Sequence, residues 1–124
     1  MYSNGYNVYK TNSVNHSSKE QLLLMLVDGA VKFTKIGRQA ILDKDMQKAH
    51  NSLVRVQDIF VELMSTLDQG AGDWAVKMFS VYAYIKDKLF EANIKKDVAI
   101  IDEIFPLIEG IRDTWNEAYK RAKR

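Results

Sequence analysis

Several ingredients are scarce or missing in this 124-residue chain. It has no cysteine, which excludes disulfides and thiolate metal sites and fits a reducing compartment. One proline and six glycines are too few for the turns of an all-β fold. No apolar run approaches the roughly 20 residues that cross a bilayer, and no secretory signal pattern stands at the N-terminus. We therefore expect a cytoplasmic protein without stable membrane insertion.

Charge of one sign is also scarce. The formal net charge is +2, which is too weak to predict a nucleic-acid surface. The basic excess lies mostly near the C-terminus, in Lys120 and in a basic tail at residues 121–124. Hydrophobic residues make up 47% and charged residues 27% of the chain, as in an ordinary folded domain with a single core.

Four segments instead carry the apolar spacing of amphipathic helices, and short polar connections separate them. Consecutive helices joined by short loops are antiparallel neighbours. The sequence therefore predicts an all-α fold, an antiparallel up-down four-helix bundle over residues 17–120. We expect its helices at about residues 18–42, 45–68, 73–94 and 97–120.

Polar residues suited to capping mark the helix ends. Ser17 and Glu20 match a capping box at the start of the first helix, and Asp45 and Asp97 are candidate N-caps. Residues 69–73 contain two glycines that can adopt positive φ, followed by an acidic cap.

Pro106 falls inside the fourth helix, where proline removes a hydrogen bond and clashes with the preceding turn. The helix either kinks near Phe105 or divides at the proline. The apolar stripe keeps its phase across this position, which favours the kink.

Residues 1–16 form a polar arm that has no means of folding alone. Tyr2, Tyr6 and Tyr9 would share one face if the arm formed a short extra helix. Such an arm has to dock on its own domain or on a partner.

The first and third helices carry more apolar surface than one core-facing stripe. Leu22 to Val27 are consecutive apolar residues, so the apolar arc of the first helix spans roughly 200°, against roughly 100° for a normal stripe. On the third helix we expect a core stripe of Trp74, Met78, Val81, Ile85, Leu89 and Ala92. A second flank contains Val76, Phe79, Ala83 and Phe90, with Tyr82 between the two. The wide arcs are either buried among neighbouring helices or form a groove that the arm covers until a partner arrives.

The second helix has polar residues on its apolar side. Its expected stripe contains Met46, Leu53, Phe60, Val61 and Met64. Gln57 lies in the middle of this stripe, with His50 seven residues before it. Gln57 is either a hydrogen-bonded residue of the bundle interior or a contact to the backbone of a bound chain. We interpret His50 as a residue at the edge of the core rather than a ligand.

Catalysis is not expected. Di-iron bundles need two Glu-x-x-His elements, and neither His16 nor His50 stands three residues after a Glu. The chain also lacks a phosphate-binding glycine loop and a nucleophile elbow. We expect no enzyme activity, no metal and no cofactor.

A set of motifs occurs in one order along nearly the whole chain and resembles the flagellar secretion chaperones of the FliS family. The motifs are Tyr6-x-x-Tyr9-Lys10, Leu24-Met25-Leu26-Val27-Asp28-Gly29-Ala30, Gln57-Asp58-Ile59, Glu62-Leu63, Ser65-Thr66-Leu67-Asp68, Tyr82-x-Tyr84, Leu89-x-x-Ala92-Asn93 and Arg112-Asp113-Thr114-Trp115. Val27, Ser18 and Pro106 depart from the family's usual pattern.

The resemblance implies a cytoplasmic export chaperone that binds the disordered C-terminal region of flagellin. It also implies prevention of premature polymerisation and presentation to the flagellar type III export gate. Implied partners are flagellin, an export gate component and other flagellar regulators, with a weak homodimer left open. Tyr6 and Tyr9 take the role of an N-terminal cap. The residues expected in the flagellin-binding groove are Leu22, Met25, Leu26, Gln57, Asp58, Phe79, Tyr82 and Asn93.

Two alternatives stay open at this point. The chain could be a helical adaptor or a self-associating bundle that uses the same apolar groove. Nucleic-acid binding through the basic tail, which has less support, would be strongly dependent on salt concentration.

Overall fold

A computed structural model describes the backbone of residues 16–122 and the side chains of residues 18–122. Within this range the chain is all-α, without strands. The arm with Tyr2, Tyr6 and Tyr9 lies outside the described residues, as do the last two residues of the basic tail. The elements are α2 (His16–Leu42), α3 (Met46–Thr66), the 3₁₀ turn η1 (Gln69–Ala71), α4 (Asp73–Lys95) and α5 (Val98–Ala122).

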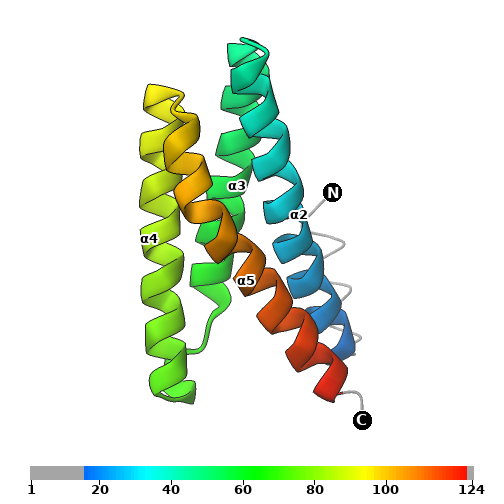
Figure 1. The fold of residues 1–124 in the computed structure, drawn as a ribbon. Helices are drawn as coiled ribbons and strands as arrows, with labels where there is room; N and C mark the ends of the chain where they lie inside the picture. Colours follow the sequence, from blue (N-terminus) through cyan, green and yellow to red (C-terminus); the bar gives the residue numbers. More distant parts are fainter. Residues whose placement is uncertain (1–15, 123–124) are drawn as a thin grey trace.

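The four helices alternate in direction and close into a ring around one core (Figure 1). α2 packs against α3 and α5, and α4 also packs against α3 and α5. Each helix therefore has two neighbours, which is the predicted up-down four-helix bundle.

Two of the predicted caps are confirmed. An oxygen of the Asp45 carboxylate accepts a hydrogen bond from the Lys48 backbone N–H at 3.1 Å. Asp97 likewise accepts from the Ala99 backbone N–H at 2.9 Å. Both carboxylates satisfy N–H groups that have no partner within their own helix.

The prediction for the α3–α4 connection is partly wrong. Gly72, not Asp73, is the N-cap of α4. Asp73 is the first helical residue, where its negative charge interacts favourably with the positive end of the helix dipole. Only Gly72 has a positive φ, 142°. Gly70 instead donates its backbone N–H to the carboxylate of Asp68, at 2.9 Å. α2 also begins at His16, so Ser17 lies in its first turn rather than before it.

α5 is continuous through Pro106, so the helix does not divide there, the alternative that the sequence did not favour. Figure 1 shows the first half of α5 beside α4 and the second half leaning away from α4 towards α2. Proline has no N–H to donate to the backbone carbonyl four residues earlier, at Asp102, and such a gap is a usual cause of a helix bend.

The core lies between the four helices and uses the predicted stripe of α4 in the second half of that helix, where Ile85, Leu89 and Ala92 are buried. Trp74 and Val81, predicted to be buried, are 50% and 36% exposed, whereas Tyr82 is 1% exposed. In the first half of α4 the buried positions are therefore displaced by one residue, to Ala75 and Tyr82. The small side chain of Ala75, and not the large one of Trp74, faces the neighbouring helices, which lets α4 approach them closely. Its buried residues are Ala75, Tyr82, Ile85, Leu89, Ala92 and Asn93.

The stripes of α3 and α5 are closer to prediction. Leu53 and Phe60 are fully buried on α3, but Met46 and Val61, predicted on the same stripe, are exposed. On α5 the buried residues are Ile101, Ile104, Ile108 and Ile111.

No helix within residues 16–122 is long and apolar enough to cross a membrane. The described part of the chain also has no cluster of three or more metal-ligating side chains.

Candidate binding surface

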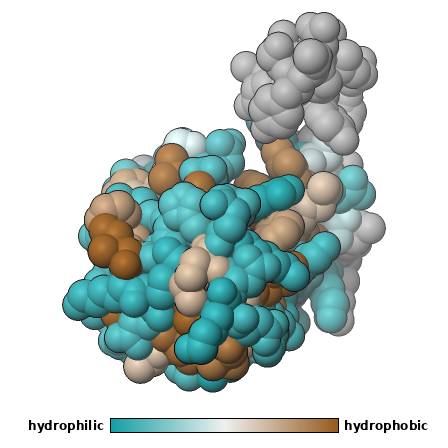
Figure 2. Space-filling model, turned by 90° about the horizontal axis from the view of Figure 1, so that it is seen from above, coloured by the Kyte–Doolittle hydropathy of each residue, from teal (hydrophilic) through white to brown (hydrophobic). Residues whose placement is uncertain are grey.

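Large apolar side chains remain exposed on the outside of the bundle. Those of α2, α3 and α4 include Leu22, Met25, Val61, Val76, Phe90 and Ile94. Figure 2 shows apolar patches separated by hydrophilic surface at the end of the molecule where α4 meets α5. Val76, Phe90 and Ile94 belong to one face and Leu22 and Met25 to another, on either side of α3.

The first is the α3–α4 face. On α4 it consists of Val76, Phe79, Ala83, Phe90 and Ile94, which are three, four or seven residues apart and so share one flank of the helix. The opposite flank of α4 carries Tyr84 and Lys88, which reach Glu103 of α5. The apolar flank therefore lies on the side of α3.

Two residues of α3 border this face. The Nδ1 atom of His50 lies 3.1 Å from Nδ2 of Asn93 on α4. His50 is exposed at the edge of the core, as predicted. Gln57, two turns later, shares the side of α3 that faces α4 and is half-buried. Its amide is therefore at the edge of the apolar surface rather than in the bundle interior.

The second is the α2–α3 face, which carries Leu22 and Met25 and is bordered by Asp58. A Cβ atom on Gly29 of α2 would lie 3.4 Å from Ile59 of α3, which places Gly29 at the junction of the two helices. Leu22 and Met25 precede it by seven and four residues and so lie on the same side.

Asp58 joins this face through the neighbouring contacts of α3. The Arg55 guanidinium stands 4.5 Å over the Phe33 ring of α2, and Asp58, three residues later, is exposed on that side. Leu26 is half-buried and packs against the core. Asp58 is therefore an exposed carboxylate on the side of α3 towards α2.

Two expected groove residues lie inside the bundle. Tyr82 packs edge-on against Phe60, with ring centroids 5.9 Å apart, and its hydroxyl accepts a hydrogen bond from Trp115 Nε1 at 2.8 Å. Burial raises the pKa of the Tyr82 hydroxyl, and the bond from Trp115 partly opposes that rise. Because Tyr82 is buried, its predicted place on an exposed groove is wrong for this arrangement of the helices.

Asn93 is also buried, at 7% exposure. Its amide nitrogen pairs with His50, but its Oδ1 has no hydrogen-bond partner. The prediction that Asn93 lines an open groove is therefore wrong as well. The Asn93 amide therefore joins α4 to α3 through His50.

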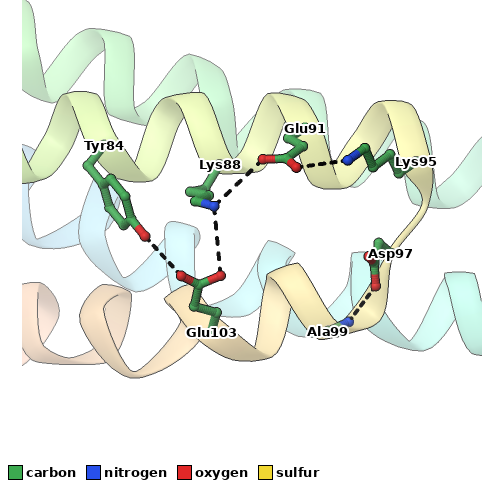
Figure 3. A network of polar contacts seen from close by, with 7 residues as sticks. All are labelled: Tyr84, Lys88, Glu91, Lys95, Asp97, Ala99 and Glu103. Atoms are coloured by element: carbon green, nitrogen blue, oxygen red, sulfur yellow. Dashed lines mark hydrogen bonds and ion pairs between the residues drawn. The ribbon is translucent and has the colours of Figure 1, made fainter.

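The remaining flank of α4 is polar (Figure 3). Tyr84 donates its hydroxyl hydrogen to Glu103 at 2.9 Å, and this bond raises the pKa of Tyr84. Lys95 donates to Glu91 at 3.0 Å and lowers the pKa of that carboxyl group. The Tyr84–Glu103 pair joins α4 to α5, whereas the Lys95–Glu91 pair lies within α4.

An open groove of about 260 Å³ lies between the first turns of α2 and the end of α5. Leu23 and Leu24 line it from α2, and Trp115 and Tyr119 from α5. The groove lies near His16, the residue at which α2 begins. It holds none of the eight groove residues expected from the sequence.

Val61, Phe90 and Ile94 were missing from that expected set. Phe90 and Ile94 follow Ala83 by seven and eleven residues, so the spacing of the apolar flank on α4 contained the signal for both. Val61 was assigned to the core because spacing alone does not show which helix faces are covered.

Known proteins share the sequence pattern and the four-helix fold of this chain. The family described as "Flagellar protein FliS" matches residues 2–122. The chain belongs to the FliS family. This family consists of flagellar export chaperones, which are not enzymes.

Relatives in several bacteria carry the name "Flagellar secretion chaperone FliS". The Bacillus subtilis relative is 33% identical over 121 residues, which cover 98% of this chain and 90% of the relative. The Campylobacter jejuni relative is 28% identical over 115 residues, which cover 92% of this chain and 90% of the relative.

A solved structure has the same fold. "Crystal structure of flagellar chaperone from bacteria" aligns with a TM-score of 0.76 and covers 98% of this chain and 99% of its own. Its sequence identity is only 16%, so this similarity concerns the four-helix arrangement.

Proposed function

We propose that this FliS chain binds the disordered C-terminal region of flagellin, prevents its premature polymerisation and delivers it to the type III export apparatus. The proposal depends mainly on one observation, the exposure of apolar side chains on two faces of a stable bundle. Met25 on the α2–α3 face is 69% exposed, and Phe90 and Ile94 on the α3–α4 face are 56% and 66% exposed. Such surface is a liability unless a partner covers it.

The two faces suit a client that wraps around the bundle. They lie on either side of α3, so a single extended chain can contact both in sequence. Gln57 and Asp58 border one face each, where an amide or a carboxylate can bond the backbone of a bound segment. A client helix would place its apolar side on the α4 flank.

Ordering a disordered client costs about 2–5 kcal/mol of the gross interaction. A client bound at two faces gains binding free energy from both. The segment of flagellin that would make contacts in the filament is then occupied by the chaperone. Premature polymerisation is prevented for this reason. The export gate component would receive the client in this bound, non-polymerising form.

In this proposal Tyr6 and Tyr9 act as a cap on the apolar surface until the client arrives. Deleting residues 1–12 should raise hydrophobic-dye binding or dimerisation and leave the helix content nearly unchanged. Unchanged dye binding together with an unchanged oligomeric state would contradict the cap.

Calorimetric titration with a flagellin C-terminal peptide tests the function directly. We expect a strongly negative heat-capacity change together with a gain in helicity, because apolar surface is buried while the peptide folds. A heat-capacity change near zero, or no binding, would count against a chaperone of disordered flagellin.

Substitutions separate the two faces. Met25→Ser and Phe90→Ser should each weaken the peptide about tenfold, since covering one large apolar side chain contributes about 1.5–3 kcal/mol. Leu42→Ser is the matched control, because Leu42 is 52% exposed at the end of α2 and belongs to neither face. Equal effects of all three variants would show that the two faces are not the binding surface.

A further inference from the structure

We propose that the end of α5 is a hinged segment, latched to α4 by Trp115, and that its opening admits the client to Tyr82. The hinge is the turn Pro106–Gly110, and the moving segment is residues 111–122. The role given to the client rests on the function proposed above, whereas the hinge itself does not.

The hinge turn contains two residues that weaken a helix. Pro106 has no N–H for the Asp102 carbonyl, which breaks the hydrogen-bond ladder of α5. Gly110, one turn later, has no neighbouring atom within 4 Å of the position that a Cβ would occupy. This turn therefore lacks one backbone hydrogen bond of the helix, and only Ile108 within it is buried.

The part of α5 before the hinge is fixed on both sides. The Arg38 guanidinium of α2 bonds both oxygens of Asp102, at 2.6 and 3.0 Å. Glu103 accepts a hydrogen bond from Tyr84 of α4 at 2.9 Å (Figure 3). Ile101 and Ile104 are fully buried between these contacts.

The part after the hinge is held much less firmly. Ile111 is its last buried residue, so residues 112–122 have none. Trp115 joins them to α4, because it donates to the Tyr82 hydroxyl at 2.8 Å and stands edge-on to Trp74 with ring centroids 6.2 Å apart. On the other side Trp115 and Tyr119 line the open groove against α2.

Movement of this segment would uncover Tyr82. The Tyr82 side chain is 1% exposed while Trp115 is seated on its hydroxyl. Val81 and Trp74 of α4 and Leu107 of α5 are already exposed beside it. An open segment would therefore join Tyr82 to existing apolar surface between α4 and α5.

Hydrogen exchange of the full chain tests the hinge without any client. Tyr82→Phe removes the hydroxyl that accepts the hydrogen bond from Trp115 and keeps the aromatic ring. The exchange rate of amides 111–118 should therefore rise about fivefold relative to that of amides 101–105, which is the change expected for one lost hydrogen bond. Tyr84→Phe is the matched control, because it removes a similar bond before the hinge. It should leave amides 111–118 unchanged.

Pro106→Ala distinguishes a hinge from simple fraying of a helix end. The alanine N–H can donate a hydrogen bond to the Asp102 carbonyl, so the Pro106→Ala substitution should slow hydrogen exchange of amides 111–118. In the double variant it should cancel most of the increase in exchange caused by Tyr82→Phe. If Tyr82→Phe has the same effect with and without Pro106→Ala, the hinge is overturned. Equal effects of Tyr82→Phe and Tyr84→Phe on amides 111–118 would overturn the latch.

Association kinetics with the flagellin C-terminal peptide test the role of the hinge. Tyr82→Phe should speed association about fivefold, Pro106→Ala should slow it, and Tyr84→Phe should leave it unchanged. Equal association rates in all three variants would overturn the client's use of the hinge. If the unaltered chain also fails to bind, the proposed function fails, while the exchange pattern still decides the hinge.

Discussion

At the scale of single residues, two glycines inside helices have opposite surroundings. A Cβ on Gly37 of α2 would lie 2.9 Å from Cδ2 and 3.1 Å from Cγ of Leu53, which is fully buried. Gly110 of α5 has open space at the same position. The same substitution should therefore have opposite effects at the two sites.

Gly110→Ala should stabilise the protein by about 0.5–1 kcal/mol, because alanine loses less entropy on entering a helix. Gly37→Ala should destabilise it by about 1 kcal/mol, since crowding of Leu53 outweighs the same gain in helix propensity. Urea unfolding of both variants measures the two effects. Equal changes in the free energy of unfolding would show that helix propensity alone determines the effect of alanine at both sites.

The Arg38–Asp102 pair provides a prediction about pH. The hydrogen bond from Arg38 lowers the pKa of Asp102 below its ordinary value in the folded state. A lowered folded-state pKa stabilises the protein above the unfolded-state value, about 3.9, and this contribution is lost as the pH falls below it. Thermal unfolding of Asp102→Asn should therefore depend less on pH below about 4 than that of the unaltered chain. An identical acid profile would contradict this.

At the scale of helices, the ends were easier to predict than the buried faces. Asp45 and Asp97 cap because their carboxylates need only reach N–H groups two or three residues away. The buried stripe of α4 agrees with the prediction at Ile85, Leu89 and Ala92 and is displaced by one residue only in the first half of the helix, where Ala75 is buried and Trp74 is exposed. Spacing gives the period of a stripe but not which residue begins it.

Asp45→Ala should destabilise the protein by about 1 kcal/mol through loss of the N-cap of α3. Asp43→Ala is a suitable control, because Asp43 lies in the same connection and accepts only a side-chain bond, from Gln39 at 3.0 Å. Denaturant midpoints of both variants provide the measurement. A larger loss for Asp43→Ala would contradict the capping role.

At the scale of the whole molecule, the eight residues expected in one groove are divided by the packing of α3. Leu22, Met25 and Asp58 lie on one side of this helix, and Gln57 and Phe79 on the other. Leu26 is half-buried against the core. Tyr82 and Asn93 are buried between helices. The candidate surface is therefore two faces and not one groove.

A client that wraps around the bundle and contacts both faces should lose affinity when either face is altered. A peptide that contacts both faces should lose affinity in Met25→Ser and Phe90→Ser by factors that multiply in the double variant, each about tenfold. A shorter peptide that reaches one face should respond to only one substitution. Fluorescence titration of both peptides measures this, and a single shared response would contradict separate faces.

The sequence by itself determined the four helices, most of their ends, the flanks with surplus apolar residues and the resemblance to the FliS family. All of these depend on contacts within a few residues or on motifs in order along the chain. The tertiary structure decided which surplus side chains stay exposed, because that depends on how each helix is rotated against its neighbours. It buried Tyr82 under Trp115 and left Phe90 and Ile94 exposed, since neither α3 nor α5 covers that flank of α4.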